Sequence, residues 1–420
     1  MEMSLKNKVG PWVVGDEFWD RKTETERLMA LLGEGENLLI VAPRRIGKTS
    51  LVRESLRQMA GRNRDIGLFV DVQDCSGPEE VIVAISIAIR QHQKIWLKIL
   101  GVFSSFLGNM IDKIDEISID KITLKIRESV AGDWQAKGTS ILETLAGAEH
   151  PVVLALDELP VMVNRMLRPK ANRISEGSIQ QTEVFLSWLR MTMGKYQGRI
   201  RWIVCGSIGL EPILSQCRLN HTIGHLRSFH LSPWENDVAD GCLQALANHS
   251  HIALPEAARQ KMLALLGCNI PQYVQMFFGY VKDHCLLKRI TQPGPEDIQW
   301  VYDQYMLSTR GHAELADLEE RLHRVLGQEL VVLAFDLLTE TSVEGVLTDA
   351  AAWQLGEWNQ ALFQPMDAGQ ALRLVMGVLE HDGYLRSKDT KGYQFVSNLV
   401  RDWWKRRFQL GYTPAKERRR

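Results

Sequence analysis

The sequence lacks an excess of charge of either sign. Its 420 residues contain 50 Lys and Arg against 51 Asp and Glu, so the formal net charge is −1. A protein that binds nucleic acid or an anionic membrane through its overall field needs a clear positive excess. Any such partner must therefore be bound by a local patch of basic residues.

Paired cysteines are also missing. The chain has six cysteines and no CxxC pair, which disfavours both a zinc site and a disulfide framework. We therefore expect a reducing, cytoplasmic setting. The cysteines are Cys75, Cys205, Cys217, Cys242, Cys268 and Cys285.

The sequence contains no long uninterrupted hydrophobic run. The N-terminus, MEMSLKNKVGPWVV, is too polar for a signal peptide. The best membrane candidate is IWLKILGVFSSFLGNMI at 95–111, but Lys98 interrupts it and the remainder is too short to cross a bilayer. We expect no membrane span and interpret this segment as a buried or partner-facing amphipathic helix. Contact with a membrane surface is the alternative.

Near-continuous apolar runs predict four strands that are covered on both faces. Helical segments separate these runs, and this alternation predicts an α/β protein with a parallel sheet. The runs are NLLIVA at 37–42, IGLFVDV at 66–72, VVLALDE at 152–158 and IRWIVCGS at 200–207.

We expect residues 1–231 to form this α/β core. The stretch at about 76–147 is longer than a minimal core needs, so we interpret it as an insertion. Within it, EISIDKITLKI at 116–126 alternates apolar and polar residues, which predicts a strand of a hairpin.

A helical subdomain is expected at 232–315, with ARQKMLALL and QYVQMFFGYVKDHCLL as amphipathic helices. The region 316–412 contains helices and then GYLRSKDTKGYQFVS, which predicts two short strands around a polar turn. Helices followed by such a hairpin predict a winged helix. We expect a basic tail at 413–420, with KERRR disordered.

The stretch LLIVAPRRIGKTSLV contains a P-loop pattern. That pattern is Gly, four residues, Gly, Lys and Ser or Thr, and here Ala42 replaces the first Gly. Backbone N–H groups of such a loop surround phosphates at a helix N-terminus, while the Lys reaches the β and γ oxygens and the Thr ligates Mg²⁺. A basic turn between strand and helix is the alternative. We expect ATP to be bound by Ala42, Pro43, Arg44, Arg45, Ile46, Gly47, Lys48, Thr49 and Ser50.

Two carboxylates follow the buried strand in VVLALDELP. Ligand chemistry in open parallel sheets lies at the carboxyl ends of the strands, which is where Asp157 and Glu158 stand. We expect Asp157 to hold the Mg²⁺ shell together with Thr49, and Glu158 to orient or deprotonate the attacking water. A solvated strand end is the alternative.

Two further residues are candidates for the catalytic set. Ser207 in CGSIGLEP follows another apolar strand, so its hydroxyl is placed to contact the γ-phosphate or the water, although Gly-Ser is also ordinary turn chemistry. Arg227 is a candidate arginine finger that would act on a neighbouring subunit. A surface salt bridge is the alternative for Arg227.

Together these elements resemble the archaeal-type ATPases of the STAND group, P-loop NTPases close to the AAA+ proteins and to archaeal origin-recognition ATPases. The resemblance begins at FWDRKTETERLMALL and continues through PRRIGKTSLV, LALDE, GSIGL and NIPQYVQMF. It ends at FVSNLVRDWWKRR. It implies an AAA+-like core followed by a helical subdomain and a winged helix.

The resemblance also implies residue roles. Lys48 and Thr49 would bind phosphate and Mg²⁺, Asp157 and Glu158 would be the Walker B pair, and Ser207 would be the sensor. The family has a Gly-x-Pro signature near the nucleotide. Here that signature reads Asn269, Ile270 and Pro271. Because Asn tolerates positive φ better than most residues, we expect the backbone shape at Asn269 to be kept and Pro271 to lie near the nucleotide.

Proteins of this group are implied to be nucleotide switches. ATP would hold the helical and winged-helix parts against the core, and hydrolysis or exchange would release them. A ligand shifts such an equilibrium only by its differential affinity for the two arrangements.

The C-terminal region leaves the partner open. The last twenty residues contain eight Lys or Arg against two acidic residues, and RDWWKRR places aromatics among charges. A basic patch on a winged helix can bind DNA. Alternatively, Trp403, Trp404 and Phe408 pack a terminal helix whose basic residues face water.

Three functional classes follow from these observations. The first is an ATP-hydrolysing switch that acts with a protein partner or by self-association. The second is an ATP-dependent DNA-binding protein, and the third is a nucleotide-binding scaffold with little turnover.

Overall fold

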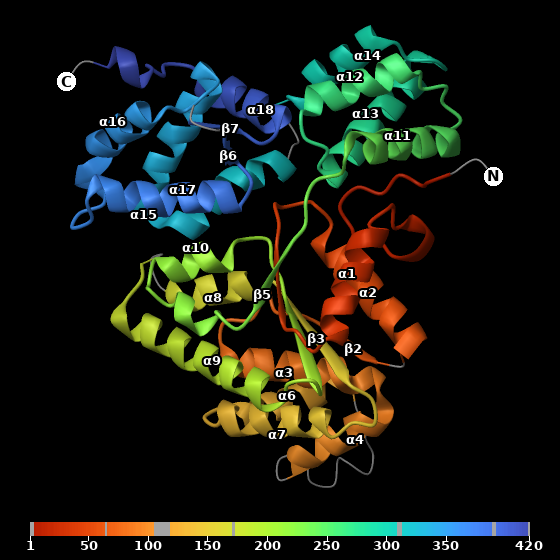
Figure 1. Ribbon diagram of the computed structural model, residues 1–420, viewed down its shortest axis with the longest axis vertical. Coiled ribbons are helices and arrows are strands. Elements are labelled where there is room, and N and C mark those ends of the chain that lie inside the picture. The colour runs from red at the N-terminus through yellow and green to blue at the C-terminus, as the bar shows by residue number, and fades with distance from the viewer. Residues whose placement is uncertain are drawn as a thin grey trace. The chain divides into compact units, whose positions relative to one another are not determined.

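The structure is a computed structural model that describes residues 4–63, 65–104, 118–169, 173–308, 313–388 and 392–418. The chain divides into two compact units (Figure 1). Unit 1 comprises Met1–Asp20, Ala42–Gly47 and Leu231–Arg420. Unit 2 comprises Arg21–Val41 and Lys48–His230.

Unit 2 contains a five-stranded sheet in the order β2-β3-β4-β1-β5. All its neighbouring strands pair in parallel, and every residue of β3 and β4 is buried. The four predicted strands are confirmed. The strands are β1 (Leu38–Val41), β2 (Ile66–Asp71), β3 (Val152–Asp157), β4 (Ile200–Val204) and β5 (Arg227–His230).

Strand β5 was not predicted. It lies at the sheet edge and pairs only with β1, and three of its four residues, RSFH, are exposed. An exposed edge strand needs no continuous apolar run, so hydrophobicity alone does not reveal it.

Helices cover the sheet of unit 2 on both faces. Figure 1 shows α8 and α9 on one side of the sheet and α1 and α2 on the other. Helix α2 packs on β2 and β3, and α9 packs on β4. The helices are α1 (Lys22–Gly33), α2 (Lys48–Asn63), α3 (Pro78–Ala88), α4 (Gln93–Val102), α6 (Ile119–Val130), α7 (Trp134–Ala146), α8 (Leu159–Leu167), α9 (Glu176–Lys195) and α10 (Leu210–Ser215).

The hairpin strand predicted at 116–126 is wrong for its described part. Residues from Ile119 onward form helix α6. The buried residues Ile122, Ile126 and Val130 recur at four-residue spacing, which is the period of a helix face. Leu124, which made the pattern look alternating, is 54% exposed. Residues 116 and 117 lie outside the described part.

The apolar segment 95–111 is helical where the structure describes it. Helix α4 ends at Val102, and Trp96, Ile99 and Leu100 are buried. This confirms a buried amphipathic helix, and residues 105–111 lie outside the described part. Among the described residues, no helix has the length and apolar character needed to cross a membrane.

Unit 1 contains the predicted amphipathic helices of the helical subdomain. They form a group in which α11 packs on α12 and α13, and α12 packs on α13 and α14. The bounds are α11 (Asn236–Ser250), α12 (Glu256–Leu266), α13 (Pro271–Lys288) and α14 (Pro295–Val301).

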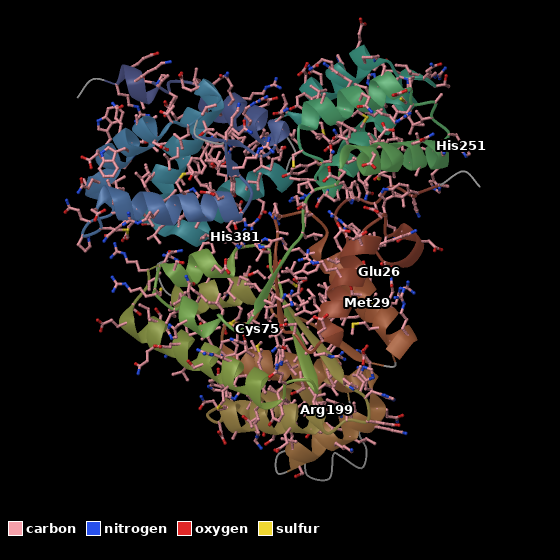
Figure 2. The ribbon with its side chains drawn as sticks, in the orientation of Figure 1. Glu26, Met29, Cys75, Arg199, His251 and His381 are labelled. Atoms are coloured by element: carbon pink, nitrogen blue, oxygen red, sulfur yellow. The ribbon has the colours of Figure 1, made fainter. Side chains whose placement is uncertain are left out.

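The C-terminal part of unit 1 is a winged helix, as predicted. Its first helix is interrupted at Gly327, where φ is 69°. An antiparallel hairpin of β6 and β7 follows α17, whose last residue is His381 (Figure 2). The bounds are α15 (Ala313–Glu344), α16 (Asp349–Asn359), α17 (Ala368–His381), β6 (Leu385–Ser387), β7 (Tyr393–Phe395) and α18 (Asn398–Phe408).

The aromatic residues of α18 pack inside unit 1. Trp403 and Trp404 are buried, and the Trp404 ring lies 4.7 Å from that of Phe408. The basic neighbours make internal contacts: Arg406 donates to the Asp303 carbonyl at 2.9 Å. This confirms the packing alternative for the aromatic residues of RDWWKRR.

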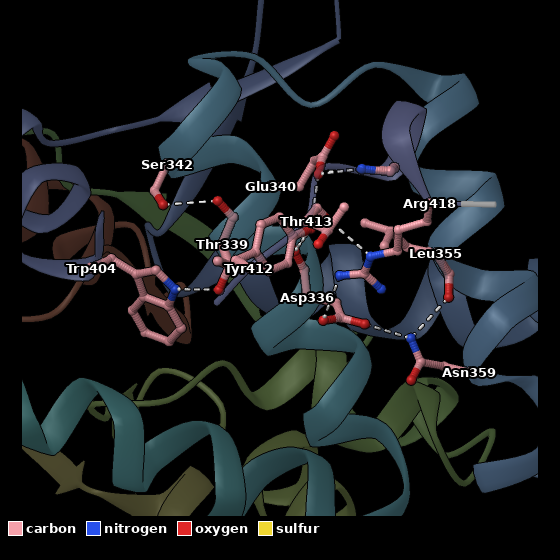
Figure 3. Close-up of polar contacts among 11 residues, drawn as sticks. Asp336, Thr339, Glu340, Ser342, Leu355, Asn359, Trp404, Tyr412, Thr413 and Arg418 are labelled. Atoms are coloured by element: carbon pink, nitrogen blue, oxygen red, sulfur yellow. Dashed lines mark hydrogen bonds and ion pairs between the residues drawn. The ribbon is translucent and has the colours of Figure 1, made fainter. Parts of the chain in front are cut away.

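The chain after α18 folds back on α15 (Figure 3). The buried Glu340 carboxylate accepts hydrogen bonds from the Tyr412 hydroxyl at 2.8 Å and the Ala415 N–H at 2.9 Å. Arg418 lies 3.5 Å from Asp336 in an ion pair. The prediction that KERRR is disordered is therefore wrong for 416–418, because the buried Glu340 fixes the segment that leads into it.

Candidate functional site

The sheet topology gathers the predicted motifs at one edge. Strand β4 lies between β1 and β3, so the carboxyl ends of these three parallel strands are neighbours. The P-loop follows β1, Asp157 and Glu158 come at the end of β3, and Ser207 comes shortly after β4. This edge is where open parallel sheets bind ligands.

The P-loop backbone has two left-handed residues. Arg45 has φ 65° and Gly47 has φ 95°, and α2 begins at Lys48. A left-handed conformation is unfavourable for an Arg, so neighbouring structure must hold Arg45 in it. A Cβ built on Gly47 would have no atom within 4 Å, so lack of space does not require a glycine there. The positive φ does, because glycine adopts it without steric cost.

Thr49 and Asp157 meet directly. The Thr49 hydroxyl donates a 2.8 Å hydrogen bond to Asp157 Oδ2, although 108 positions separate them in the sequence. A hydroxyl beside a carboxylate matches Mg²⁺, which takes oxygen ligands and is bound through one or two carboxylates, water and substrate phosphates. The described residues include no group of three or more His, Cys, Asp or Glu that could hold a metal ion.

The second oxygen of Asp157 has partners that the sequence did not indicate. Cys205 lies at 3.1 Å from Oδ1 and donates its thiol hydrogen, and the backbone N–H of Glu158 donates to the same oxygen at 3.1 Å. Burial raises the pKa of Cys205 well above its ordinary value, and the charge of Asp157 raises it further. The thiol therefore stays protonated and orients the carboxylate.

Glu158 and Ser207 form the second pair of the site. Both the backbone N–H and the hydroxyl of Ser207 donate to Glu158 Oε2, each at 2.8 Å. Glu158 has φ 61°, an unfavourable left-handed conformation that redirects its side chain as α8 begins. The Ser207 hydroxyl thus contacts Glu158. The sequence had predicted that it contacts the γ-phosphate or the water instead.

The Glu158 carboxylate is in a poorly solvated position. Burial raises its pKa, and the neighbouring charge of Asp157 raises it further, whereas the hydrogen bonds from Ser207 lower it. A raised pKa makes a carboxylate a stronger base, which suits proton transfer from water. Gly206 allows the approach of the two segments, since a Cβ there would lie 2.6 Å from Pro160 Cδ.

Two more charged residues belong to this edge and were missed. Asp71 is paired in register with Asp157 across β2 and β3, and burial raises its pKa. Arg53 of α2 lies over the Phe69 ring, 3.7 Å from its centroid. Burial lowers the pKa of Arg53, while Asp157 and Asp71 raise it. Asp71 is the next-to-last residue of the IGLFVDV run and the last residue of β2, which was the one available signal.

Comparison with known proteins gives matches among solved structures only. No protein-family model and no curated protein matches the chain. The Walker-type ATPase PABY2304 of Pyrococcus abyssi matches with TM-score 0.59 and 16% identity, covering 95% of this chain and 99% of that chain. The ORC2 protein of Aeropyrum pernix matches with TM-score 0.52 and 12% identity, covering 96% and 97%. Likeness at such identity establishes the fold.

The chain has the P-loop AAA+ fold. Within this fold the predicted P-loop follows β1, the predicted Walker B pair stands at the end of β3, and the predicted sensor Ser207 follows β4.

Arg227 lies at the amino end of its strand, whereas the predicted P-loop, Asp157, Glu158 and Ser207 follow the carboxyl ends of theirs. It begins β5 and pairs in register with Leu38, the first residue of β1. Its side chain is 49% exposed, and its guanidinium lies 3.3 Å from Glu36 Oε1. This location matches the salt-bridge alternative and also leaves Arg227 accessible to a second subunit.

Asn269 does not adopt the conformation expected of it. It has no positive φ, and its side chain donates to the Trp234 carbonyl at 3.2 Å and to Asn236 Oδ1 at 2.8 Å. The Asn269 side chain therefore links the Trp234 carbonyl to Asn236. Pro271 is the first residue of α13, and the next residue, Gln272, donates its N–H to the Arg45 carbonyl at 3.4 Å.

Proposed function

We propose that the chain is a Mg²⁺-dependent ATPase that works as a STAND-type molecular switch. The observation that supports this most is the pair of contacts at the ends of β3 and β4, namely Thr49 to Asp157 and Ser207 to Glu158. The first joins a phosphate-loop hydroxyl to an acid, and the second fixes beside it a carboxylate whose pKa is raised by burial. A phosphoryl-transfer site needs both functions.

Each residue has a role in this proposal. Backbone N–H groups of residues 42–50 and the Lys48 ammonium would bind the ATP phosphates, and Thr49 and Asp157 would hold Mg²⁺. The ion would neutralise charge on the β- and γ-phosphate oxygens. Cys205 orients Asp157, Ser207 orients Glu158, and Glu158 accepts a proton from the attacking water.

The similar ORC2 structure of Aeropyrum pernix is described as ADPNP and ADP complexes, which supports nucleotide as the ligand class. We further propose that nucleotide state controls the helical and winged-helix parts of this chain. A protein partner or a second copy would receive this change, in a reducing, cytoplasmic setting.

DNA binding through the winged helix is the weaker alternative. The described part of α18 uses Arg406 on the Asp303 carbonyl and Arg407 on Glu319 at 2.9 Å. On α17, the exposed charged residues are one basic and one acidic, Arg373 and Glu380. A DNA-reading helix needs a positive excess, so a protein-contacting winged helix is favoured.

The proposal is tested by measuring the Kd of Mg·ATP and the rate of phosphate release in the wild type and three variants. Lys48→Ala should weaken binding about 10- to 100-fold, because a charged hydrogen-bond donor to phosphate is lost. Glu158→Gln should bind ATP normally and lose hydrolysis about 10²-fold or more. Lys195→Ala, which changes an exposed lysine at the end of α9, is the control and should match the wild type. Equal turnover in Glu158→Gln and wild type would remove the catalytic role of Glu158.

A further inference from the structure

The P-loop makes side-chain contacts that phosphate binding does not explain. Residues 42–47 belong to unit 1 together with the helical subdomain and the winged helix. Arg44 forms an ion pair with Asp317 of α15. Beside it, the Arg45 carbonyl accepts the hydrogen bond from the Gln272 N–H at 3.4 Å.

A third contact involves the turn between α17 and β6. Gly383 has φ 79°, and a Cβ built on it would lie 2.8 Å from Pro43 Cβ. The turn thus approaches the loop so closely that only glycine fits without a shift. We call the contacts Arg44 to Asp317, Arg45 to Gln272 and Pro43 to Gly383 the loop latch.

The face of α15 that meets the loop is charged and partly buried. Asp317 also forms an ion pair with Arg324, with 2.9 Å between the guanidinium nitrogen and the carboxylate oxygen. One turn after Asp317, the guanidinium of Arg321 is 3% exposed and lies 3.7 Å from the Asp382 carboxylate. The exposed fractions of the Arg44 and Asp317 side chains are 28% and 23%, so their attraction is less screened than that of a surface pair.

The pKa of the buried Tyr273 is affected by the same group of charged residues. Burial raises its pKa, and the positive charges of Arg45, Arg44 and Arg321 lower it in turn. Two loop arginines and an arginine of the winged helix therefore lie near one hydroxyl within unit 1. Asp317 and Asp382 are the described carboxylates with ion pairs to this group.

We propose that Asp317 is a regulatory residue that competes with nucleotide phosphate for Arg44, so that the nucleotide-free chain keeps its P-loop bound to the winged helix. This inference rests on the proposed function. A carboxylate close to the loop repels incoming phosphate and also occupies a guanidinium that would otherwise attract it. By linkage, nucleotide must weaken the latch by the same factor by which the latch weakens nucleotide binding.

The proposal specifies whether ATP strengthens or weakens the contact between the P-loop and the winged helix. The family resemblance implies that ATP holds the winged helix against the core, whereas the charges at Arg44 and Asp317 imply that phosphate releases the P-loop from α15. ATP carries one more phosphate than ADP, so it should oppose the latch more strongly.

The test is a double-mutant cycle on Arg44 and Asp317 read by the Kd of Mg·ATP, with Glu158→Gln in every protein to prevent hydrolysis. Asp317→Asn should tighten binding about fivefold, the upper range for a partly exposed ion pair. In the Arg44→Gln background, Asp317→Asn should produce a smaller change, because Arg44, the guanidinium for which Asp317 and phosphate compete, is gone. Glu319→Gln is the matched control, since it removes the same charge from the same helix but its ion-pair partner is Arg407.

The outcomes separate the two proposals. Binding in the parent protein with no tightening in Asp317→Asn overturns the latch and leaves the ATPase proposal standing. If neither protein binds Mg·ATP, the proposed function fails and the latch fails with it. If Glu319→Gln tightens Mg·ATP binding as much as Asp317→Asn does, the loss of any negative charge from α15 has the same effect. That result would also overturn the latch.

A second measurement needs no nucleotide. Trypsin cleaves after Arg44 and Arg45, and the latch should protect these bonds. Cleavage in the loop should be about fivefold faster in Asp317→Asn than in Glu319→Gln, matching the loss of the ion pair. Equal cleavage rates in these two variants would contradict the proposal, provided that both unfold at the wild-type temperature.

Discussion

Glu158 combines burial, an unfavourable backbone conformation and a raised pKa. Its pKa in the folded chain lies above its value in the unfolded chain. Burying the carboxylate therefore costs stability in full above the folded pKa, and that cost disappears below the unfolded pKa.

We therefore expect Glu158→Gln to raise the thermal unfolding temperature at pH 8. The amide oxygen can still accept both hydrogen bonds from Ser207 and has no charge to desolvate. The gain should shrink as the pH falls through the folded pKa of Glu158. Unfolding scans of both proteins from pH 8 to pH 4 measure this, and a gain that is constant with pH would contradict the ionised, buried carboxylate.

Ser207 provides a separate test at the same scale. Ser207→Ala removes the hydroxyl donor but keeps the backbone N–H donor to Glu158. We expect a drop in kcat of about tenfold with little change in KM, because one positioning hydrogen bond is lost. A change in KM alone would instead place Ser207 in phosphate binding, as the sequence had predicted.

At this scale the sequence predicts residues that belong to short motifs and misses those that meet across the sheet. Thr49, Asp157 and Glu158 stand in local patterns that indicate their chemistry. Asp71 and Cys205 reach Asp157 only because β2 and β4 flank β3, and no spacing along the chain encodes that.

At the scale of elements, close packing between helices and strands limits which residues can change. A Cβ on Gly138 of α7 would lie 2.6 Å from Ile82 Cδ1 and 2.7 Å from Trp188 Cζ2. Gly101 of α4 has nothing within 4 Å of the same position. These two helical glycines form a matched pair.

Gly138→Ala should lower the free energy of unfolding by about 1–3 kcal/mol through overpacking, which outweighs the gain in helix propensity. Gly101→Ala should raise it by about 0.5–1 kcal/mol, since only the propensity term acts there. Urea unfolding of both variants measures the two changes. If the two substitutions shift stability in the same direction, the packing of α7 against α3 and α9 is wrong.

The sequence predicts elements well where burial is strong. The runs of β1, β3 and β4 form the inner strands of the sheet, and their apolar pattern is continuous because both faces are covered. The error at α6 has a local cause: the exposed Leu124 imitates alternation, while the buried Ile122, Ile126 and Val130 follow the helical period. Edge strand β5 has too little buried surface to produce a pattern.

At the scale of the whole molecule, the division into two units could not be predicted. Residues 42–47 cluster with residues 231–420, although they join β1 to α2 in the sequence. One contact of this kind, Arg44 with Asp317, joins residues 273 positions apart (317 − 44). No hydrophobic period encodes a contact of that kind. The predicted domain limits at 231, 315 and 412 stay predictions.

Assembly is the other property at this scale. If Arg227 acts on a neighbouring subunit, Arg227→Ala should leave the rate of a dilute monomer unchanged. It should lower the rate of concentrated protein about 10³-fold or more, the range for arginine fingers. Sedimentation would define the two states before the rates are compared. Equal slowing at every concentration would contradict a role in trans.

The most direct test of the central claim is phosphate release from Mg·ATP across a protein concentration series, with Glu158→Gln measured in parallel to expose contaminating ATPase. We predict release that Glu158→Gln abolishes while ATP stays bound. A specific rate that climbs with concentration would further show a site completed between subunits, and a flat, slow rate would indicate a monomeric switch that awaits its partner. Release that continues unchanged in Glu158→Gln would contradict the account, because the carboxylate fixed by Ser207 would then not be the base.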